Sequence, residues 1–221
     1  MPLTSKPIHH AVFYGQARMT TQPYPPGNPW HMDEAGYSVL EYDPDKARSI
    51  LKKKAVGTEI HMIGTISPTY AIQIAEVIQN MWNEVGFKVR LEPVDRAVRT
   101  EKLRKGDFHA HIQGHSYRFD PDAYFDRNLH SKSTYAARLS GWHNARYDKL
   151  IEEAKRSPDQ AKRRELYTAG WKIVNEELPQ FYLSELSMIS AAHKSVQDYK
   201  PSVVAPYTYS GGGVRIAHIR A

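Results

Sequence analysis

The chain has 221 residues, of which 41% are hydrophobic and 24% charged, a composition typical of folded globular proteins rather than of disordered chains. Its net charge of +6 comes from cations spread along the sequence, not gathered with aromatic residues in a stripe, so nucleic-acid binding is not expected. The absence of cysteine excludes disulfides, thiolate zinc sites and a cysteine nucleophile.

The N-terminal part of the chain is rich in proline. The tripeptide Pro25-Pro26-Gly27 can neither continue a helix nor donate to a sheet ladder. Residues 1–42 are therefore expected to form an ordered but irregular arm.

The next segments alternate between helix and strand patterns. A helix from about Asp45 to Lys54 follows a capping Asp43 and Pro44, and "TEIHMIG" then has the period-2 pattern of a strand. The strongest helix pattern ends at Gly86 and has its apolar residues on one face: Ile74, Val77, Ile78, Met81, Trp82 and Val85.

A second such unit comes directly after. "FKVRLE" alternates as a strand, a polar helix from about Asp95 to Lys105 is closed by Gly106, and "FHAHIQG" indicates a third strand. Strands and helices in this order predict an α/β fold, in which helices cover a sheet in layers.

The C-terminal part is predicted to be mainly helical at first. "NARYDKLIEEAKR" and "SPDQAKRRELYTAGWKIVNEEL" are helix patterns, with Ser157 and Pro158 as the expected start of the second helix. "FYLSELSMISAAH" has strand character, and a last short strand is possible at Val214 to Ile219.

Two groups of residues offer chemistry in principle. Asp120 and Asp122 invite a paired-carboxylate interpretation, but Asp-Pro-Asp more often forms a turn that caps the following helix. His109 and His111 would leave the same face of a strand, with His115 close behind, yet they lack a recognisable set of further metal ligands. We expect a turn at the first group, and no metal site at the second.

Motifs of enzyme active sites and cofactor sites are missing. The sequence contains no G-x-S-x-G, Walker loop, H-E-x-x-H or G-x-G-x-x-G motif. We therefore expect a protein that is not an enzyme and that carries no cofactor.

The ordered segments "YDPDKARSIL", "AEVIQNMWNEVGFKVRLEP", "KGDFHAHIQG" and "DPDAYF" together resemble the C-terminal half of the extracellular solute-binding proteins of peptide/nickel-type ABC importers. The resemblance extends to a late helix pattern, matched in order by Asp159, Arg163 or Arg164, Leu166, Tyr167, Ile173, Val174 and Pro179. It implies a lobe of a type II, peptide-binding-like periplasmic binding protein, with a mixed sheet covered by helices.

The resemblance also implies a domain organisation and a place for the ligand. Residues 1–42 would be the arm and hinge segment, 43–200 the ligand-binding lobe, and 201–221 a return segment.

In relatives that bind peptides, the loop after the strand's glycine carries an aromatic residue and an aspartate that holds the peptide amino terminus. In this sequence that loop has His115, Ser116, Tyr117 and Arg118, and Arg96 falls where such relatives often have a tryptophan. A cation at these positions favours an anionic or carboxylate-bearing ligand. The alternative is that Arg118 braces the loop by pairing with Asp120 or Asp122.

The expected function is capture of a small solute or peptide by hinge closure and its delivery to an ABC permease. The alternative is a truncated or split-gene interaction domain without transport function of its own. Periplasmic or extracellular location is implied by the resemblance, although the first residues do not form a signal peptide. The resemblance implies that the opposing N-terminal lobe is missing or belongs to a second chain, and in that case Phe13, Tyr14 and Trp30 are expected to be exposed or to drive dimerisation.

Overall fold

The computed structural model describes residues 5–33, 42–54, 59–114, 120–186, 192–198 and 218–219. In chain order its elements are α1 (Ser5–Phe13), β1 (Arg18–Met19), α2 (Pro44–Lys54), β2 (Glu59–Thr65), α3 (Thr69–Val85), β3 (Lys88–Val94), α4 (Arg96–Lys105), β4 (Ala110–His111), α5 (Asp122–Leu129), α6 (Thr134–Leu139), α7 (Ala145–Arg156), α8 (Gln160–Glu177), β5 (Ser184–Glu185), β6 (Val196–Gln197) and β7 (His218–Ile219).

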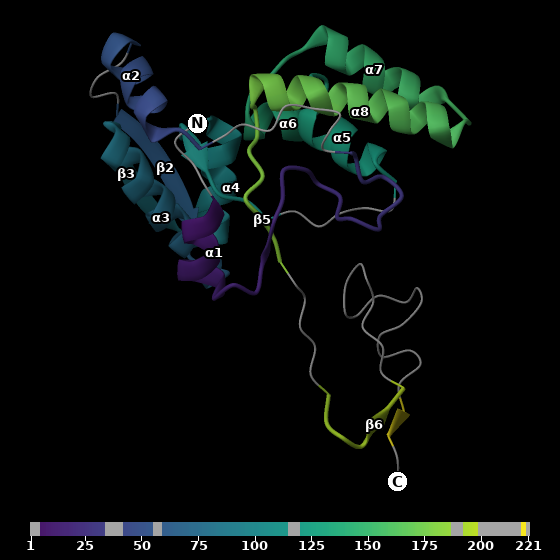
Figure 1. Cartoon of the computed structure of the whole chain (residues 1–221), viewed down its shortest axis with the longest axis horizontal. Coiled ribbons are helices and arrows are strands. Elements are labelled where there is room, and N and C mark those ends of the chain that lie inside the picture. Colours follow the sequence, from purple (N-terminus) through teal and green to yellow (C-terminus); the bar gives the residue numbers. More distant parts are fainter. Residues whose placement is uncertain are drawn as a thin grey trace.

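A three-stranded parallel sheet of order β3-β2-β4 organises the first half of the fold (Figure 1). β2 pairs with β3 along its whole length, and with β4 at Met62↔Ala110 and Ile63↔His111. Parallel neighbours need helical crossovers, which α3 and α4 supply. The predicted α/β layered fold is confirmed.

Successive residues of β2 point to opposite faces of the sheet and enter different cores. Met62 packs with the apolar face of α3, where Ile74 and Ile78 are buried. Ile63 packs on the other side with Leu103 of α4 and Leu139 of α6. The sheet is thus covered on both faces, as a parallel sheet requires.

A layer of helices, α5 to α8, forms the second half (Figure 1). Its core is rich in aromatic residues and includes two residues of the arm: Tyr24, Met32, Tyr124, Phe125, Leu129, Tyr147, Ile151, Ala154, Leu166, Tyr167, Trp171, Ile173 and Val174. The proline-rich arm therefore packs against these helices.

The expected exposure of three aromatic residues is correct for one of them. Tyr14 is 84% exposed. Phe13 is half-buried, with its ring 6.0 Å from that of Tyr70, and Trp30 is half-buried against Tyr167, with ring centroids 5.9 Å apart. The prediction for Phe13 and Trp30 was wrong because folding of the arm onto α3 and α8 covers both rings.

Helix ends follow local capping chemistry, with one correction. Gly86 ends α3 in the left-handed conformation, at φ 112°, and Gly106 does the same for α4, at φ 70°. Ser157 does not start α8 as predicted. Asp159 caps it instead by accepting from the N–H groups of residues 161 and 162, at 2.8 and 3.3 Å.

Some elements differ in extent from the sequence prediction. α1 and α6 were not predicted, and β4 and β5 are each only two residues long. The predicted last strand is present at His218–Ile219, paired antiparallel with β6, while Val214 lies outside the described residues. Within the described ranges, no helix combines the length and the apolar character needed to cross a bilayer.

Candidate functional site

The carboxyl edge of the parallel sheet is the candidate functional site. β2 ends at Thr65, β3 at Val94 and β4 at His111, and helices α3 and α4 begin just beyond the first two strands. In open parallel sheets ligands bind outside the carboxyl ends of the strands. The topology therefore brings the ends of three separate segments to the place where a ligand is expected.

Arg96 lies at this edge as the first residue of α4, and its side chain is exposed. Asp95 caps the helix by accepting from the N–H of Val98 at 2.8 Å. Val98 and Ile66 leave apolar surface at the same edge, with 42% and 51% of their area exposed. The edge thus offers a cation and apolar contact area together.

The other predicted ligand residues, His115, Ser116, Tyr117 and Arg118, lie outside the described residues. The chain leads to them through Gly114. The hydroxyl oxygen of Tyr70, in the first turn of α3, lies 3.4 Å from the position that a Cβ at residue 114 would take. α3 and the end of the β4 segment therefore approach one another closely at this edge.

Sequence reasoning missed a second set of polar residues, Thr65, Arg99 and Gln113. Thr65 follows Ile63 by two residues, so it lies on the same face of β2 and one step nearer the carboxyl edge. Arg99 lies one helical turn before Leu103 on α4. Because α4 begins at the carboxyl edge, Arg99 is nearer to that edge than Leu103 is. Both positions lie just beyond the small core that Ile63 and Leu103 share.

Gln113 joins this set from the segment after β4. His111 pairs with Ile63, and Gln113 follows it by two residues, just beyond the end of β4. Nε2 of Gln113 donates to the hydroxyl of Tyr135 on α6 at 2.6 Å. Burial, the largest cause, lowers the pKa of His111 to about 4; a hydrogen bond that the ring donates to the Gln113 side chain opposes this shift, and the positive charge of Arg99 adds to it. The strand pattern placed residues 65 and 113 near the ends of their strands, but the sequence carried no signal for the effect of Arg99 on His111.

The Asp-Pro-Asp segment forms the predicted turn, but the N-cap residue of α5 is Pro121, which makes no side-chain capping hydrogen bond. Oδ1 of Asp120 accepts from the N–H of Asp122 at 2.9 Å, immediately before α5. Asp120 also binds Arg163, and Asp122 accepts from the hydroxyl of Tyr167. Partial burial, the largest cause, raises the pKa of Asp122. Because both carboxylates are held by α8, the turn ties α5 to that helix.

The histidines of the β4 segment also have structural partners. Nδ1 of His109 accepts from the N–H of His61 at 2.9 Å, and the ring of His111 packs edge-on against Phe108 with centroids 4.9 Å apart. His115 is outside the described residues. Across the described part of the chain, no group of three or more His, Cys, Asp or Glu residues is arranged to hold a metal ion.

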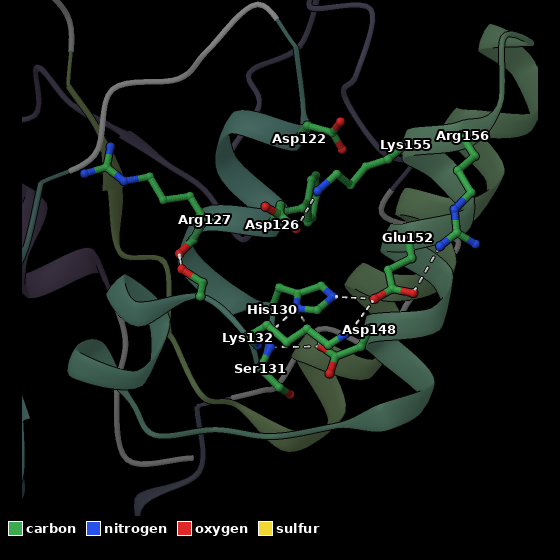
Figure 2. A network of polar contacts seen from close by, with 12 residues as sticks. Asp122, Asp126, Arg127, His130, Ser131, Lys132, Asp148, Glu152, Lys155 and Arg156 are labelled. Atoms are coloured by element: carbon green, nitrogen blue, oxygen red, sulfur yellow. Dashed lines mark hydrogen bonds and ion pairs between the residues drawn. The ribbon is translucent and has the colours of Figure 1, made fainter.

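Two surface concavities lie elsewhere. One, of about 490 Å³, is formed between α5, α6 and α7, and Figure 2 shows its charged residues joined in pairs. Lys132 and Lys155 lie 3.0 Å from Glu152 and Asp126, respectively, and the buried His130 lies between α7 carboxylates. These contacts hold the end of α5 against α7, so the charges stabilise the packing of the two helices.

The second concavity, of about 540 Å³, is lined by residues of the arm and by Arg164. Its two arginines are engaged: Arg18 pairs with Glu185, and Arg164 donates to the carbonyl of His31 at 2.8 Å. Neither concavity has among its lining residues a buried polar atom without a partner. The carboxyl edge has two such atoms, Oγ1 of Thr65 and Nε of Arg99, which distinguishes it from both.

Comparison with known proteins gives a consistent match. Residues 5–136 match the model of the bacterial extracellular solute-binding proteins, family 5 Middle. The chain is 31% identical to di/tripeptide-binding protein 1 of Pseudomonas aeruginosa over 209 residues, which cover 91% of this chain and 38% of that protein.

Solved structures of low sequence identity share the fold. A dipeptide-binding protein from Pseudoalteromonas sp. SM9913 in complex with Met-Leu matches 99% of this chain and 43% of its own, with a TM-score of 0.80 at 18% identity. NikA from Staphylococcus aureus in complex with Ni(L-His)2 matches 90% of this chain and 43% of its own, with a TM-score of 0.77 at 17% identity. The chain spans 38–40% of the length of the curated relatives that it matches first.

Proposed function

Because the chain belongs to the bacterial extracellular solute-binding proteins of family 5, we propose that it supplies one lobe of a solute receptor that captures a small molecule for an ABC permease. The observation that carries this proposal is the parallel sheet whose carboxyl edge presents Arg96, exposed apolar residues and buried polar atoms without partners. This is the arrangement of a ligand-binding surface, in which a few placed polar groups orient a ligand on apolar contact area.

An opposing lobe would complete the cleft. A cleft between two lobes needs both walls, and this chain would supply one of them. The short antiparallel pair of β1 and β5 joins residues far apart in sequence through the contact of Arg18 with Glu185, which suits the hinge predicted within residues 1–42. Residues 43–200 would then be the ligand-binding lobe, and 201–221 a return segment.

The ligand class that the edge favours is a small solute with a carboxylate, such as a short peptide. Relatives are named for di- and tripeptides, and the two solved structures hold Met-Leu and a nickel complex of L-histidine. Both ligands contain carboxylate groups of amino acids. In this chain Arg96, and Arg118 in the adjacent loop, supply the cations suited to such a group.

The family name places these proteins outside the cytoplasm, and its members bind rather than transform their ligands. We extend both properties to this chain as a receptor of the periplasm or cell surface without catalytic activity. The complementary lobe and the permease would be its protein partners.

Thermal unfolding in the presence of a ligand panel tests the proposal. The panel contains dipeptides, tripeptides and Ni²⁺ with L-histidine, each at millimolar concentration, because one lobe alone binds weakly. A ligand that binds the native state raises Tm with its concentration. We expect a rise with at least one carboxylate-bearing solute, reduced in Arg96→Ala and in Arg118→Ala but kept in Arg104→Ala on the exposed face of α4. No rise with any member would favour an interaction domain without a ligand of its own.

A further inference from the structure

The outward side of α2 carries cations with an apolar residue between them. α2 packs on the end of α3 through Ala47 and Leu51, which are buried against Val85. The residues on the other side of the helix are exposed and lie three or four positions apart, so they are neighbours on its surface: Lys46, Ser49, Ile50 and Lys53. These four residues form the α2 stripe.

The lysines of the α2 stripe are not neutralised by neighbouring carboxylates. Asp45, the acidic residue of α2, pairs with Arg48, at 2.6 Å. Within the described part of the chain, neither Lys46 nor Lys53 forms an ion pair, and the exposed Lys52 beside them forms none. The stripe therefore presents uncompensated positive charge to the solvent.

The other basic helix of the sheet half, α4, differs in this respect. Its Lys102 lies 2.7 Å from Asp107, and Arg104 and Lys105 lie 2.7 and 3.1 Å from Glu101. Cations that are paired within the chain attract a charged partner less strongly, because each partner carboxylate offsets part of the field. The free lysines are thus a property of α2 and not of every basic helix in this chain.

Apolar side chains lie within the same basic surface. Ile50 is 50% exposed, and Tyr42, two residues before the helix begins, is 48% exposed. Cations beside exposed apolar and aromatic side chains suit the surface of a bilayer, where the cations attract lipid phosphates and the other side chains enter the interface. A polyanion in water would use the lysines but not Ile50.

The position of α2 keeps it clear of the candidate functional site. α3 begins at the carboxyl edge of the sheet and ends at the opposite edge, because it returns the chain from the end of β2 to the start of β3. α2 packs on Val85, the last residue of α3, and lies on the outside of the sheet half, away from helices α5 to α8 (Figure 1). A partner bound at α2 therefore leaves the carboxyl edge uncovered.

We propose that the α2 stripe docks on an anionic phospholipid surface, with Lys46 and Lys53 on lipid phosphates and Ile50 in the interface between them. Each lysine near an anionic membrane strengthens binding about fivefold at low salt, so a few lysines give a weak and reversible attachment. The attachment keeps the chain beside a membrane that contains an ABC permease. It goes beyond the proposed function and does not depend on solute capture.

Co-sedimentation with lipid vesicles tests the proposal. The purified chain is mixed with vesicles of phosphatidylcholine, or with vesicles of phosphatidylcholine and phosphatidylglycerol in equal parts. We expect binding to the anionic vesicles at low salt, loss of this binding at high salt because salt screens the charges, and no binding to phosphatidylcholine alone. Equal binding to both kinds of vesicle, or no binding to the anionic vesicles at low salt, overturns the proposal.

Variants locate the contact on α2. Lys46→Gln and Lys53→Gln should each weaken vesicle binding about fivefold, and together about thirtyfold. Ile50→Ser changes no charge and should weaken binding about threefold or more. Lys105→Gln in α4 is the matched control: it removes the same charge, but from a lysine that is paired with Glu101, and should leave binding nearly unchanged. Equal losses in Lys105→Gln and Lys53→Gln would show that binding follows net charge alone, which overturns the role of α2.

An acidic peptide distinguishes a lipid surface from an acidic protein partner. Binding of poly-glutamate by a chain that does not bind the anionic vesicles overturns the phospholipid surface in favour of such a protein. Thermal unfolding of each variant confirms that the substitutions at these exposed positions leave the fold intact. Failure of vesicle binding leaves the solute-receptor function standing, because the rise of Tm with solute is measured without vesicles.

Discussion

Arg163 on α8 donates through a single nitrogen, Nη2, to both carboxylate oxygens of Asp120, at 2.9 and 3.0 Å. The same guanidinium lies over the ring of Trp30, 5.1 Å from its centroid. One side chain thus joins the Asp-Pro-Asp turn, the proline-rich arm and the helical layer. The Asp120 carboxylate that a catalytic interpretation requires is used to hold these three segments together.

Removal of this contact should lower stability. Arg163→Ala deletes the pair with Asp120 and the stacking on Trp30, so we expect a loss of about 1–2 kcal/mol in the free energy of unfolding by urea. Arg156→Ala is the matched control, because that side chain is 80% exposed and forms a long ion pair with Glu152, at 3.6 Å. Equal stability of the two variants would refute the bracing role of Arg163.

Two fully buried tyrosines should respond oppositely to loss of the hydroxyl. The hydroxyl of Tyr147 donates to the carbonyl of Phe125 at 2.9 Å, whereas that of Tyr24 has no hydrogen-bond partner. Tyr147→Phe should cost about 1–2 kcal/mol, and Tyr24→Phe should be neutral or stabilising by up to about 1 kcal/mol. Urea unfolding at neutral pH measures both. A larger loss in Tyr24→Phe than in Tyr147→Phe would contradict the assignment.

His111 should make the protein sensitive to mild acid. Its pKa of about 4 in the folded state lies below the ordinary value of 6.5, so the unfolded chain binds a proton that the folded chain does not as the pH falls through this range. The contribution of His111 to the free energy of unfolding is therefore fully present above pH 6.5. It is lost as the pH falls towards 4, by up to about 3 kcal/mol.

Unfolding free energies of wild type and His111→Gln, measured at a series of pH values, check this prediction. The variant keeps a polar side chain but cannot titrate, so its stability should fall less steeply between pH 6.5 and 4. Identical slopes for the two proteins would show that His111 does not contribute.

Close packing beneath β2 gives a further prediction. A Cβ at Gly64 would lie 2.5 Å from Cδ1 of Ile72 and 3.2 Å from Cβ of Ala75, so Gly64→Ala should destabilise by about 1–3 kcal/mol. At Gly170, in α8, the nearest atom is Cδ1 of Ile151 at 3.2 Å, and the higher helix propensity of alanine offsets the tighter contact. Gly170→Ala should therefore be the milder change in thermal unfolding, and the reverse order would argue against this packing.

The sequence was informative where local chemistry determines structure. The apolar face of α3 and the glycines after α3 and α4 were recognisable, because helix periodicity and left-handed caps depend on few neighbouring residues. The polar helix predicted from about Asp95 to Lys105 likewise matches α4, while the ligand-binding role of Arg96 stays a prediction.

Features that depend on distant contacts could not be predicted. Trp30 is covered because Arg163 and Tyr167, far along the chain, lie against it. Thr65 at the end of β2, Arg99 in α4 and Gln113 just after β4 come from segments that are separate in the sequence. No single segment of sequence carries the signal for such a site.

Hydrogen exchange on the purified chain, with and without the solute that raises Tm most, tests the central claim that the carboxyl edge binds the ligand. We predict that added solute slows exchange in residues 63–67, 94–99 and 111–114, while exchange in α7 stays unchanged. Protection confined to the concavity between α5 and α7, or no protection at the edge under saturating solute, would contradict the account.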